Sequence, residues 1–147
     1  MKIMFDSNSF DKMWESDEDL EKIITSSIYT YYITSIQIEE IGNIPDKYRE
    51  TRIKNLLALC KIRAHLLYTP AVVGFSRIGN CVLLSDEDIE IYKELLKETK
   101  SNIMDALIGT TAKREGCTIV TDDNDFSKKL KKCSVPTMTY NEFAQSL

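Results

Sequence analysis

The chain has 147 residues, of which 43% are hydrophobic and 29% are charged, and its formal net charge is −4 at pH 7. This is an ordinary globular composition and predicts a single domain over residues 1–147 with a sizeable core. There is no long apolar run and no secretory leader pattern, which argues against a membrane span and against export, so we expect a cytoplasmic protein.

Histidine and cysteine are too sparse to carry the chemistry that they often carry together. Cys60, Cys81, Cys117 and Cys133 form no C-x-x-C pair, and His65 is the only histidine. A zinc site and catalysis of the Ser-His-Asp or Cys-His kind are therefore disfavoured, and we expect reduced, mostly buried thiols. Any catalysis would depend on carboxylates, lysines or a bound metal.

The first predicted strand ends in an acid. Residues 2–5 (KIMF) form a short apolar run typical of a buried parallel strand, and Asp6 follows directly. An S-x-x-D capping box at residues 16–19 then predicts a helix, and residues 29–34 (YTYYIT) predict a second strand. Functional side chains gather beyond the carboxyl ends of the strands in an open parallel sheet, so Asp6 is a candidate site residue.

A glutamate pair lies on the next predicted helix. Ser35 can cap this helix and Pro45 closes it, while three isoleucines define its apolar arc. Glu39 points nearly opposite to that arc and fits a solvated face. Glu40 lies at the edge of the arc, so we expect it to be half-buried at a cleft.

The middle of the chain predicts one long helix over residues 46–64. Its predicted inward face comprises Ile53, Leu56, Leu57, Cys60 and Ala64. Lys47, Lys54 and Lys61 recur every seven residues and so lie near one stripe. Such a stripe can follow a phosphate backbone, but it is more often only the solvated side of a helix. Residues 66–84 then predict a hairpin or two short strands.

A second helical acid follows. Ser85 and Asp88 form another S-x-x-D helix start, and residues 103–115 predict the next helix. On that helix Asp105 shares one face with Gly109, where a glycine favours close approach of another backbone. Taken alone, Asp105 is better explained as an acid in the first helical turn, stabilised by the helix dipole.

The last third of the chain again places acids after a strand. Gly116 stops the helix, residues 118–121 predict a strand, and Asp122, Asp123 and Asp125 follow at once. Asp125 can cap a short lysine-rich helix. The closing elements are a strand and a helix, at residues 135–139 and 140–147. Strands alternating with helices predict an α/β domain with a mostly parallel sheet.

Four acids thus come from four separate places in the chain. They are Asp6, Glu40, Asp105 and Asp123. Clustered carboxylates repel one another, which raises their pKa values, and they persist mainly where a cation neutralises them. Oxygen ligands of this kind suit Mg²⁺ or Mn²⁺. Neutralising the four acids would bring the formal charge to zero, so the net charge does not exclude a nucleic-acid partner.

The sequence also resembles the PIN-domain nucleases, which include the VapC-type ribonuclease toxins. Four motifs carry the resemblance in the family's order and spacing: D-S-N-S-F at 6–10, I-E-E-I at 38–41, M-D-A-L-I-G-T-T-A at 104–112 and I-V-T-D-D-N-D-F at 119–126. The resemblance covers residues 1–45 and 82–143, and the middle of the chain departs from a compact toxin.

The resemblance implies a PIN-like three-layer α/β/α fold and a Mg²⁺- or Mn²⁺-dependent endoribonuclease. The catalytic and metal-binding residues that it implies are Asp6, Glu40, Asp105 and Asp123, supported by Asn8, Thr121 and Asp125. The family pattern T-x-D-x-D-F selects Asp123 rather than Asp122.

The implied partners are an RNA substrate, an antitoxin protein and a second copy of the chain in a homodimer. Lys54, Lys61, Lys128 and Lys129 are candidates for contacts with the RNA backbone. The alternative interpretation is a non-catalytic PIN-like module that binds RNA or protein.

Overall fold

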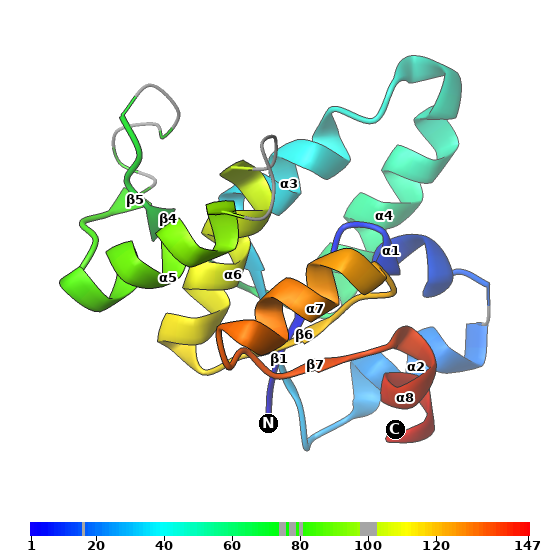
Figure 1. Ribbon diagram of the computed structural model, residues 1–147. Helices are drawn as coiled ribbons and strands as arrows, with labels where there is room; N and C mark the ends of the chain where they lie inside the picture. Colours follow the sequence, from blue (N-terminus) through cyan, green and yellow to red (C-terminus); the bar gives the residue numbers. More distant parts are fainter. Residues whose placement is uncertain (16, 74–75, 77–78, 80, 98–102) are drawn as a thin grey trace.

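A five-stranded parallel sheet forms the centre of the molecule. The computed structural model describes residues 1–15, 17–73, 76, 79, 81–97 and 103–147 (Figure 1). The strand order is β3-β2-β1-β6-β7, and every neighbouring pair is parallel. The strands are β1 (Lys2–Phe5), β2 (Thr30–Thr34), β3 (His65–Leu67), β6 (Thr118–Val120) and β7 (Thr137–Met138). The predicted α/β class is confirmed.

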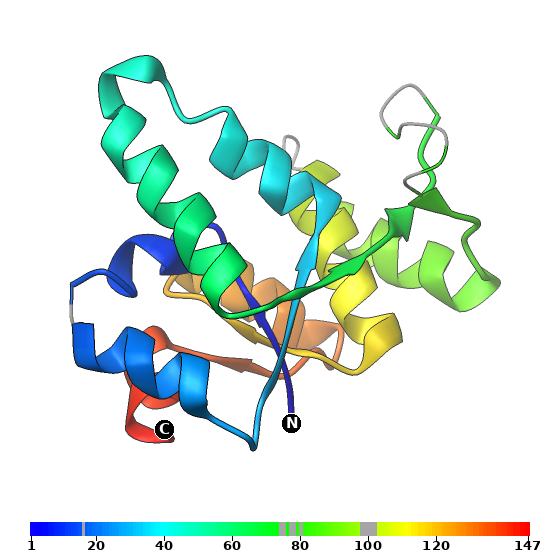
Figure 2. The ribbon, with the colours of Figure 1, turned by 180° about the vertical axis from the view of Figure 1, so that it is seen from behind.

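Helices cover both faces of this sheet, which confirms the three predicted layers. On one face lie α1 (Ser9–Lys12), α2 (Asp17–Thr25), α4 (Arg49–Lys61) and α8 (Tyr140–Gln145). On the other lie α5 (Asp86–Lys97), α6 (Ile103–Glu115) and α7 (Asn124–Lys132). Figure 1 shows α6 and α7 in front of the sheet, and Figure 2 shows α2 and α4 from behind. Side chains alternate along each strand, so Ile3 and Phe5 pack against one layer and Met4 against the other.

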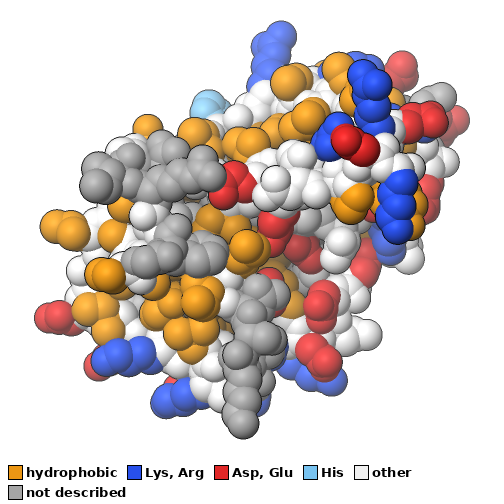
Figure 3. All heavy atoms as spheres, turned by 90° about the horizontal axis from the view of Figure 1, so that it is seen from above, with side chains coloured by type: hydrophobic (Ala, Val, Ile, Leu, Met, Phe, Trp, Pro, Cys, Tyr) orange, Lys and Arg blue, Asp and Glu red, His pale blue; other side chains and the backbone are white. Residues whose placement is uncertain are grey.

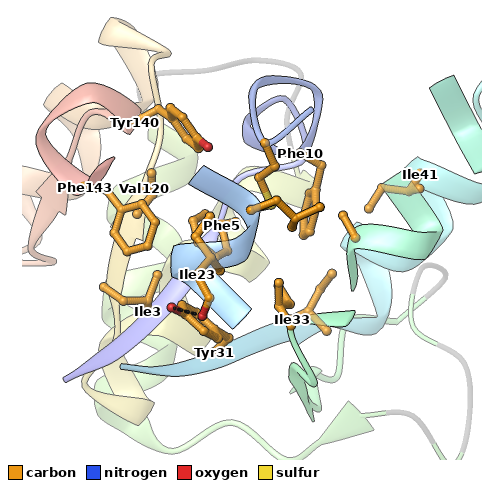
Figure 4. Close-up of a cluster of buried hydrophobic side chains, with 14 residues drawn as sticks. Ile3, Phe5, Phe10, Ile23, Tyr31, Ile33, Ile41, Val120, Tyr140 and Phe143 are labelled. Atoms are coloured by element: carbon orange, nitrogen blue, oxygen red, sulfur yellow. Dashed lines mark hydrogen bonds between the residues drawn. The ribbon is translucent and has the colours of Figure 1, made fainter. Parts of the chain in front are cut away.

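Aromatic packing fixes the end of the central strand (Figure 4). Phe5 is 1% exposed. Its ring centroid lies 5.9 Å from that of Phe10, 5.6 Å from that of Tyr31 and 5.0 Å from that of Phe143. Because Asp6 follows Phe5 directly, these contacts also fix the backbone that carries the first predicted acid.

Two helices begin one or two residues away from the predicted cap. The N-cap of α3 (Ser35–Gly42) is Thr34 rather than Ser35, and its Oγ1 accepts from the Gln37 backbone N–H at 3.3 Å. The N-cap of α7 is Asp123 rather than Asp125. In both cases an earlier residue of a capping type has the extended conformation that a cap requires. The helix therefore begins directly after that residue.

Other predicted helix boundaries agree better. The Ser85 backbone N–H donates to Asp88 Oδ2 at 3.1 Å and the Asp88 N–H donates to Ser85 Oγ at 3.1 Å, so the predicted capping box at the start of α5 is confirmed. Gly116 has a φ of 67° just beyond α6, as expected for a helix stop. The capping box at residues 16–19 lies partly outside the described residues.

The long central helix is shorter than predicted and presents a different face. Residues Asp46–Tyr48 form a 3-10 turn, η1, and α4 follows. Ile53 and Leu57, predicted to face inward, are 45% and 49% exposed, whereas Asn55 and Ala58 are buried. Apolar residues occur on several sides of this helix, so its periodicity did not identify the buried one.

The region after α4 contains short strands and no hairpin among the described residues. Beyond β3, strands β4 (Thr69–Pro70) and β5 (Cys81–Val82) pair in parallel, whereas the strands of a hairpin are antiparallel. Cys117 is buried, but Cys60 is exposed and the other two cysteines are half-buried, so the expectation of mostly buried thiols is wrong. In the described ranges, no helix is both long and apolar enough to span a membrane.

Candidate active site

Predicted acids meet at the carboxyl edge of the sheet, where β1 and β6 end. The Asp6 backbone N–H donates to the Val120 carbonyl oxygen at 2.9 Å, which joins the two strand ends. Thr121 Oγ1 donates to Asp6 Oδ2 at 2.9 Å and accepts from the Asp123 N–H at 3.1 Å. Thr121 therefore links the acids that follow the two strands. Seen from above, Asp and Glu side chains gather near the middle of this face (Figure 3).

Glu40 reaches this edge from α3. It is half-buried while Glu39 is exposed, as the periodicity predicted. Gln37 lies one turn before Glu40, is fully buried, and donates from Nε2 to the Phe5 carbonyl oxygen at 2.7 Å. This hydrogen bond fastens the start of α3 to the end of β1, and so positions the glutamate beside the strand.

Ser7 connects the first two acids. Its backbone N–H donates to Asp6 Oδ1 at 2.8 Å, and its hydroxyl donates to Glu40 Oε2. Sequence reasoning missed both Ser7 and Gln37, because neither is charged. The available signal was their position: Ser7 directly follows a strand-end acid, and Gln37 stands one helical turn from a predicted ligand.

Asp105 completes a group of mutually repelling carboxylates. It is half-buried in the first turn of α6. Burial raises its pKa to about 6, with further increases from the charges of Asp6 and Glu40 and an opposing effect of Lys129. Burial likewise raises the pKa of Asp6 and of Glu40. A helix dipole acting alone would lower the pKa of Asp105, so burial and repulsion outweigh it.

Asp123 serves the fold as well as the candidate site. Its Oδ1 accepts from the backbone N–H groups of Asp125 at 2.8 Å and Phe126 at 2.9 Å, which caps α7. Its charge also contributes to the raised pKa values of Asp6 and Asp105. The structure thus places Asp123 close enough to the other acids for electrostatic coupling.

Asp122 has a structural role instead. Its Oδ2 lies 2.7 Å from Lys12 Nζ, and its Oδ1 accepts from the Tyr140 N–H at 3.3 Å. These contacts join the start of α8 and the end of α1 to the sheet edge. Asp122 is thus tied to Lys12 and Tyr140, whereas the charge of Asp123 acts on Asp105.

Two of the predicted supporting residues, Asp125 and Asn8, lie at the margin of the candidate site. Asp125 is 83% exposed and pairs with Lys128 at 3.5 Å. Within the described part of the chain, no hydrogen bond or ion pair joins its carboxylate to the other predicted acids. Asn8 is exposed and lines a hollow beside Ser7.

The donor chemistry fits a divalent cation, but the neighbouring carboxylates are not oriented around one point. The half-buried acids offer the hard oxygen atoms that Mg²⁺ and Mn²⁺ prefer. Across residues 1–147 apart from the undescribed ones, no three His, Cys, Asp or Glu side chains are arranged to hold a metal ion. Ser7 and Thr121 already donate to Asp6 and Glu40. Binding a cation would therefore require these carboxylates to turn toward one another.

The chain has a three-layer α/β/α fold with a parallel sheet, and acidic residues lie beyond the carboxyl ends of strands β1 and β6. These two features together define the class of protein. The sequence matches the family model of the PIN domain over residues 3–132. The chain belongs to the PIN domain family. The match includes the middle of the chain, which the motif resemblance had left out.

Solved structures show the same fold. PAE2754 from Pyrobaculum aerophilum is 14% identical, with a TM-score of 0.64 over 99% of this chain and 97% of that chain. VapBC2 from Rickettsia felis, solved with a promoter DNA fragment, is 20% identical, with a TM-score of 0.58 over 95% and 98%. VapBC-1 from nontypeable Haemophilus influenzae is 13% identical, with a TM-score of 0.57 over 96% and 99%. A search of curated proteins found no significant match.

Proposed function

We propose that the chain is a Mg²⁺- or Mn²⁺-dependent endoribonuclease that hydrolyses RNA phosphodiester bonds. Its metal-binding and catalytic residues would be Asp6, Glu40, Asp105 and Asp123. The observation that carries the proposal is the convergence of acids from separate elements, with the pKa of Asp105 raised to about 6. Burying mutually repelling carboxylates is unfavourable for the fold, and a bound cation would remove that repulsion.

The residues of the chain would divide the work between holding and positioning. The four acids would hold the cation, which when bound would supply an activated water and positive charge for the leaving oxygen. Ser7 and Thr121 would position Asp6 and Glu40 through the hydrogen bonds described above. Thr121 also sets the backbone from which Asp123 projects.

An antitoxin partner and a homodimer are part of the same proposal. They rest on the resemblance to VapC-type toxins and on the fold shared with two VapBC structures. We expect the product of an adjacent gene to bind this chain and to inhibit cleavage at a one-to-one ratio. Titration of that product into a cleavage assay, beside light scattering of each species, would measure both associations.

The ends of the RNA products test the mechanism. An activated water needs no 2′-hydroxyl nucleophile, so cleavage should leave 3′-hydroxyl and 5′-phosphate ends. We expect EDTA to abolish cleavage and added Mg²⁺ or Mn²⁺ to restore it. Digestion of end-labelled RNA, followed by phosphatase and ligase treatment, would identify the ends.

Two results would reject this mechanism: cyclic phosphate ends, and activity that survives EDTA. RNA binding without cleavage, whichever divalent ion is added, would favour the non-catalytic module instead.

A further inference from the structure

A hollow of about 400 Å³ opens beside the candidate site, lined by residues of α1, α3, η1 and α4 and of the loops that follow β1 and α3. Ser7 lines it and also donates to Glu40, so the hollow adjoins the predicted acids. Ile41, Ile44, Pro45 and Tyr48 supply its apolar and aromatic lining. A volume of this size is at the lower end of the roughly 300–1,000 Å³ typical of small-ligand pockets.

Asn55 gives this hollow a specific chemical requirement. It lines the hollow and is 2% exposed. Its Nδ2 donates to Asp11 Oδ1 at 2.7 Å. Because a carboxylate accepts hydrogen bonds, this contact fixes the orientation of the amide and leaves Oδ1 as the remaining acceptor. Oδ1 has no hydrogen-bond partner within the residues that the structure describes. Oδ1 is itself buried, so an N–H donor of a ligand would satisfy it once the Asn55 side chain turns toward the hollow.

The part of the wall formed by the segment between α3 and α4 is held in place by the protein itself. Arg52 Nη1 donates to the Ile44 carbonyl oxygen at 2.9 Å, and Nη2 donates to Asp46 Oδ1 at 2.8 Å. These bonds hold the segment between α3 and α4 against α4. The hollow is therefore formed before a ligand arrives, which reduces the entropic cost of binding.

A second hollow of about 300 Å³ extends the first one along α4. The two share Asp11, Thr51 and Asn55. The second is also lined by Trp14, Glu15 and Lys54. Together the two hollows, which we call the α4 groove, run from the candidate site toward Trp14 and the oppositely charged Glu15 and Lys54.

One lysine of the predicted stripe lines the α4 groove, and the other two lie over aromatic rings of its lining. Lys47 Nζ lies 4.8 Å from the centre of the Tyr48 ring, and Lys61 Nζ lies 5.4 Å from that of Trp14. Lys54 lines the second hollow itself, and its Nζ is paired with Glu50 Oε1 at 3.1 Å. Aromatic walls beside regularly spaced cations are typical of surfaces that bind single-stranded nucleic acid. The groove thus favours RNA over a peptide as its occupant.

We propose that the first hollow binds one nucleobase of a single-stranded RNA substrate, and that Asn55 Oδ1 accepts a hydrogen bond from that base. The proposal rests on the proposed function, because it places the base next to the scissile phosphate. Asn55 Oδ1 and the Asp11 carboxylate are neighbouring acceptors. They match guanine, which has adjacent N–H donors on its Watson–Crick edge, and they match uracil least, because its single N–H lies between two carbonyls.

Binding of short RNAs to the Asp105→Asn protein, which should not cut them, tests this assignment. The probes are fluorescein-labelled hexauridylate and the same RNA with one central G, A or C, measured by fluorescence anisotropy. We expect the G-containing RNA to bind about tenfold more tightly than hexauridylate, since an unpaired buried acceptor is costly. Adding Asn55→Leu should remove this difference. Asn141→Leu, at an exposed asparagine on α8, is the matched control and should keep it.

A second variant covers the case in which Asn55→Leu fails to fold, which melting curves would show. Tyr48 is 54% exposed and lines the hollow, so Tyr48→Ala should fold normally. It should weaken the binding of every probe several-fold and keep the order of base preference. Unchanged affinity for the G-containing RNA in Tyr48→Ala would overturn the proposal.

The remaining outcomes separate this proposal from the nuclease proposal. Equal affinity for all four probes, or a preference for G that persists in Asn55→Leu, would overturn the base site even if the wild type cleaves RNA. A preference that Asn55→Leu removes, in a protein that never cleaves, would support the base site and reject the nuclease. Blocking of the groove by a bound protein, with no base preference in the free chain, would also overturn the base site.

Discussion

Asp105 carries a negative charge in a place that disfavours it. Burial and the neighbouring charges of Asp6 and Glu40 raise its pKa to about 6, and Lys129 compensates only in part. A structural acid is normally placed where its charge is stabilised, so this arrangement is typical of a functional site. The expected consequence is that the metal-free protein is less stable than it would be without this charge.

Replacing Asp105 by Asn should separate function from stability. We expect Asp105→Asn to reduce cleavage at least 100-fold, yet to leave the metal-free protein as thermostable as the wild type or more so. Mg²⁺ should raise the melting temperature of the wild type more than that of the variant, because a ligand stabilises the state that binds it. Melting curves with and without Mg²⁺, beside one cleavage assay, measure both effects. A variant that is less stable and still active would contradict the site.

The same pair of proteins has a defined pH dependence. The folded-state pKa of Asp105 is about 6, above its ordinary value of 3.8. The stability gained by protonating it is complete below about pH 4 and is lost as the pH rises through 6. Without metal, the melting temperature of Asp105→Asn should therefore exceed that of the wild type most near pH 7, and the difference should vanish near pH 4. A constant difference across that range would show that the charge of Asp105 is not the cause.

Residue type explains which parts of the candidate site the sequence could predict. Acids directly after short apolar strands are visible because their position and their chemistry both point to a site. Ser7, Gln37 and Asn55 are uncharged, and their importance depends on partners 33, 32 and 44 residues away in sequence. No local pattern contains such contacts, so only the folded arrangement showed them.

At the scale of elements, α6 is held between its neighbours at Gly109. A Cβ there would lie 2.8 Å from Leu95 Cδ1 of α5 and 2.9 Å from Leu130 Cδ2 of α7. The sequence correctly indicated a close approach. The expectation of another backbone was wrong, because the neighbours are leucine side chains that interlock over the missing Cβ.

Gly109→Ala tests how tightly these helices fit. Helix propensity alone would stabilise the variant by about 1 kcal/mol. Overpacking of a filled core costs about 1–3 kcal/mol, so we expect a net loss of roughly 1 kcal/mol in the free energy of unfolding. Gly42→Ala is the matched control, because Gly42 ends α3 with nothing within 4 Å of its Cβ position, and it should be neutral or stabilising. Urea denaturation measures both. Equal stabilisation by the two substitutions would show that the leucines move aside freely.

The buried face of helix α4 could not be predicted from the periodicity of its apolar residues. Its apolar residues surround the helix, so no single face was distinguished, and the polar Asn55 became the buried one. Packing against α1 and α3 selected that face, and these contacts are not encoded locally. The predicted lysine stripe holds only for Lys54 and Lys61, because Lys47 lies in the 3-10 turn η1 before the helix begins.

For the whole molecule, the alternation of strands and helices was enough to predict the layers. Parallel strands need crossover helices, and an apolar run such as residues 2–5 fits a strand covered on both faces. The pairing of β3 with β2 and the small β4–β5 sheet were not predictable, because their strands are only two or three residues long.

The distribution of charge over the molecule leads to a test of RNA binding. Net charge is −4, so lysines rather than overall charge would have to attract RNA. We expect Lys128→Gln with Lys129→Gln to weaken RNA binding and to reduce the slope of log affinity against log salt by about 1.4, at roughly 0.7 per phosphate contact. Filter binding across a salt series measures this. Lys93→Gln, at an exposed lysine on α5, is the control. An unchanged slope in the double variant would show that these lysines do not contact the RNA backbone and only form a solvent-exposed surface.

The cap of α7 would couple cation binding at the candidate site to the order of the first turn of this helix. Both capping bonds use Oδ1 of Asp123, so a cation held through the same carboxylate would also anchor the first turn of α7. Occupancy of the site and order at the start of that helix would then be thermodynamically linked. Loss of the ion would loosen a stretch of backbone as well as empty a site, and slower amide exchange at Asp125 and Phe126 would report the loaded state.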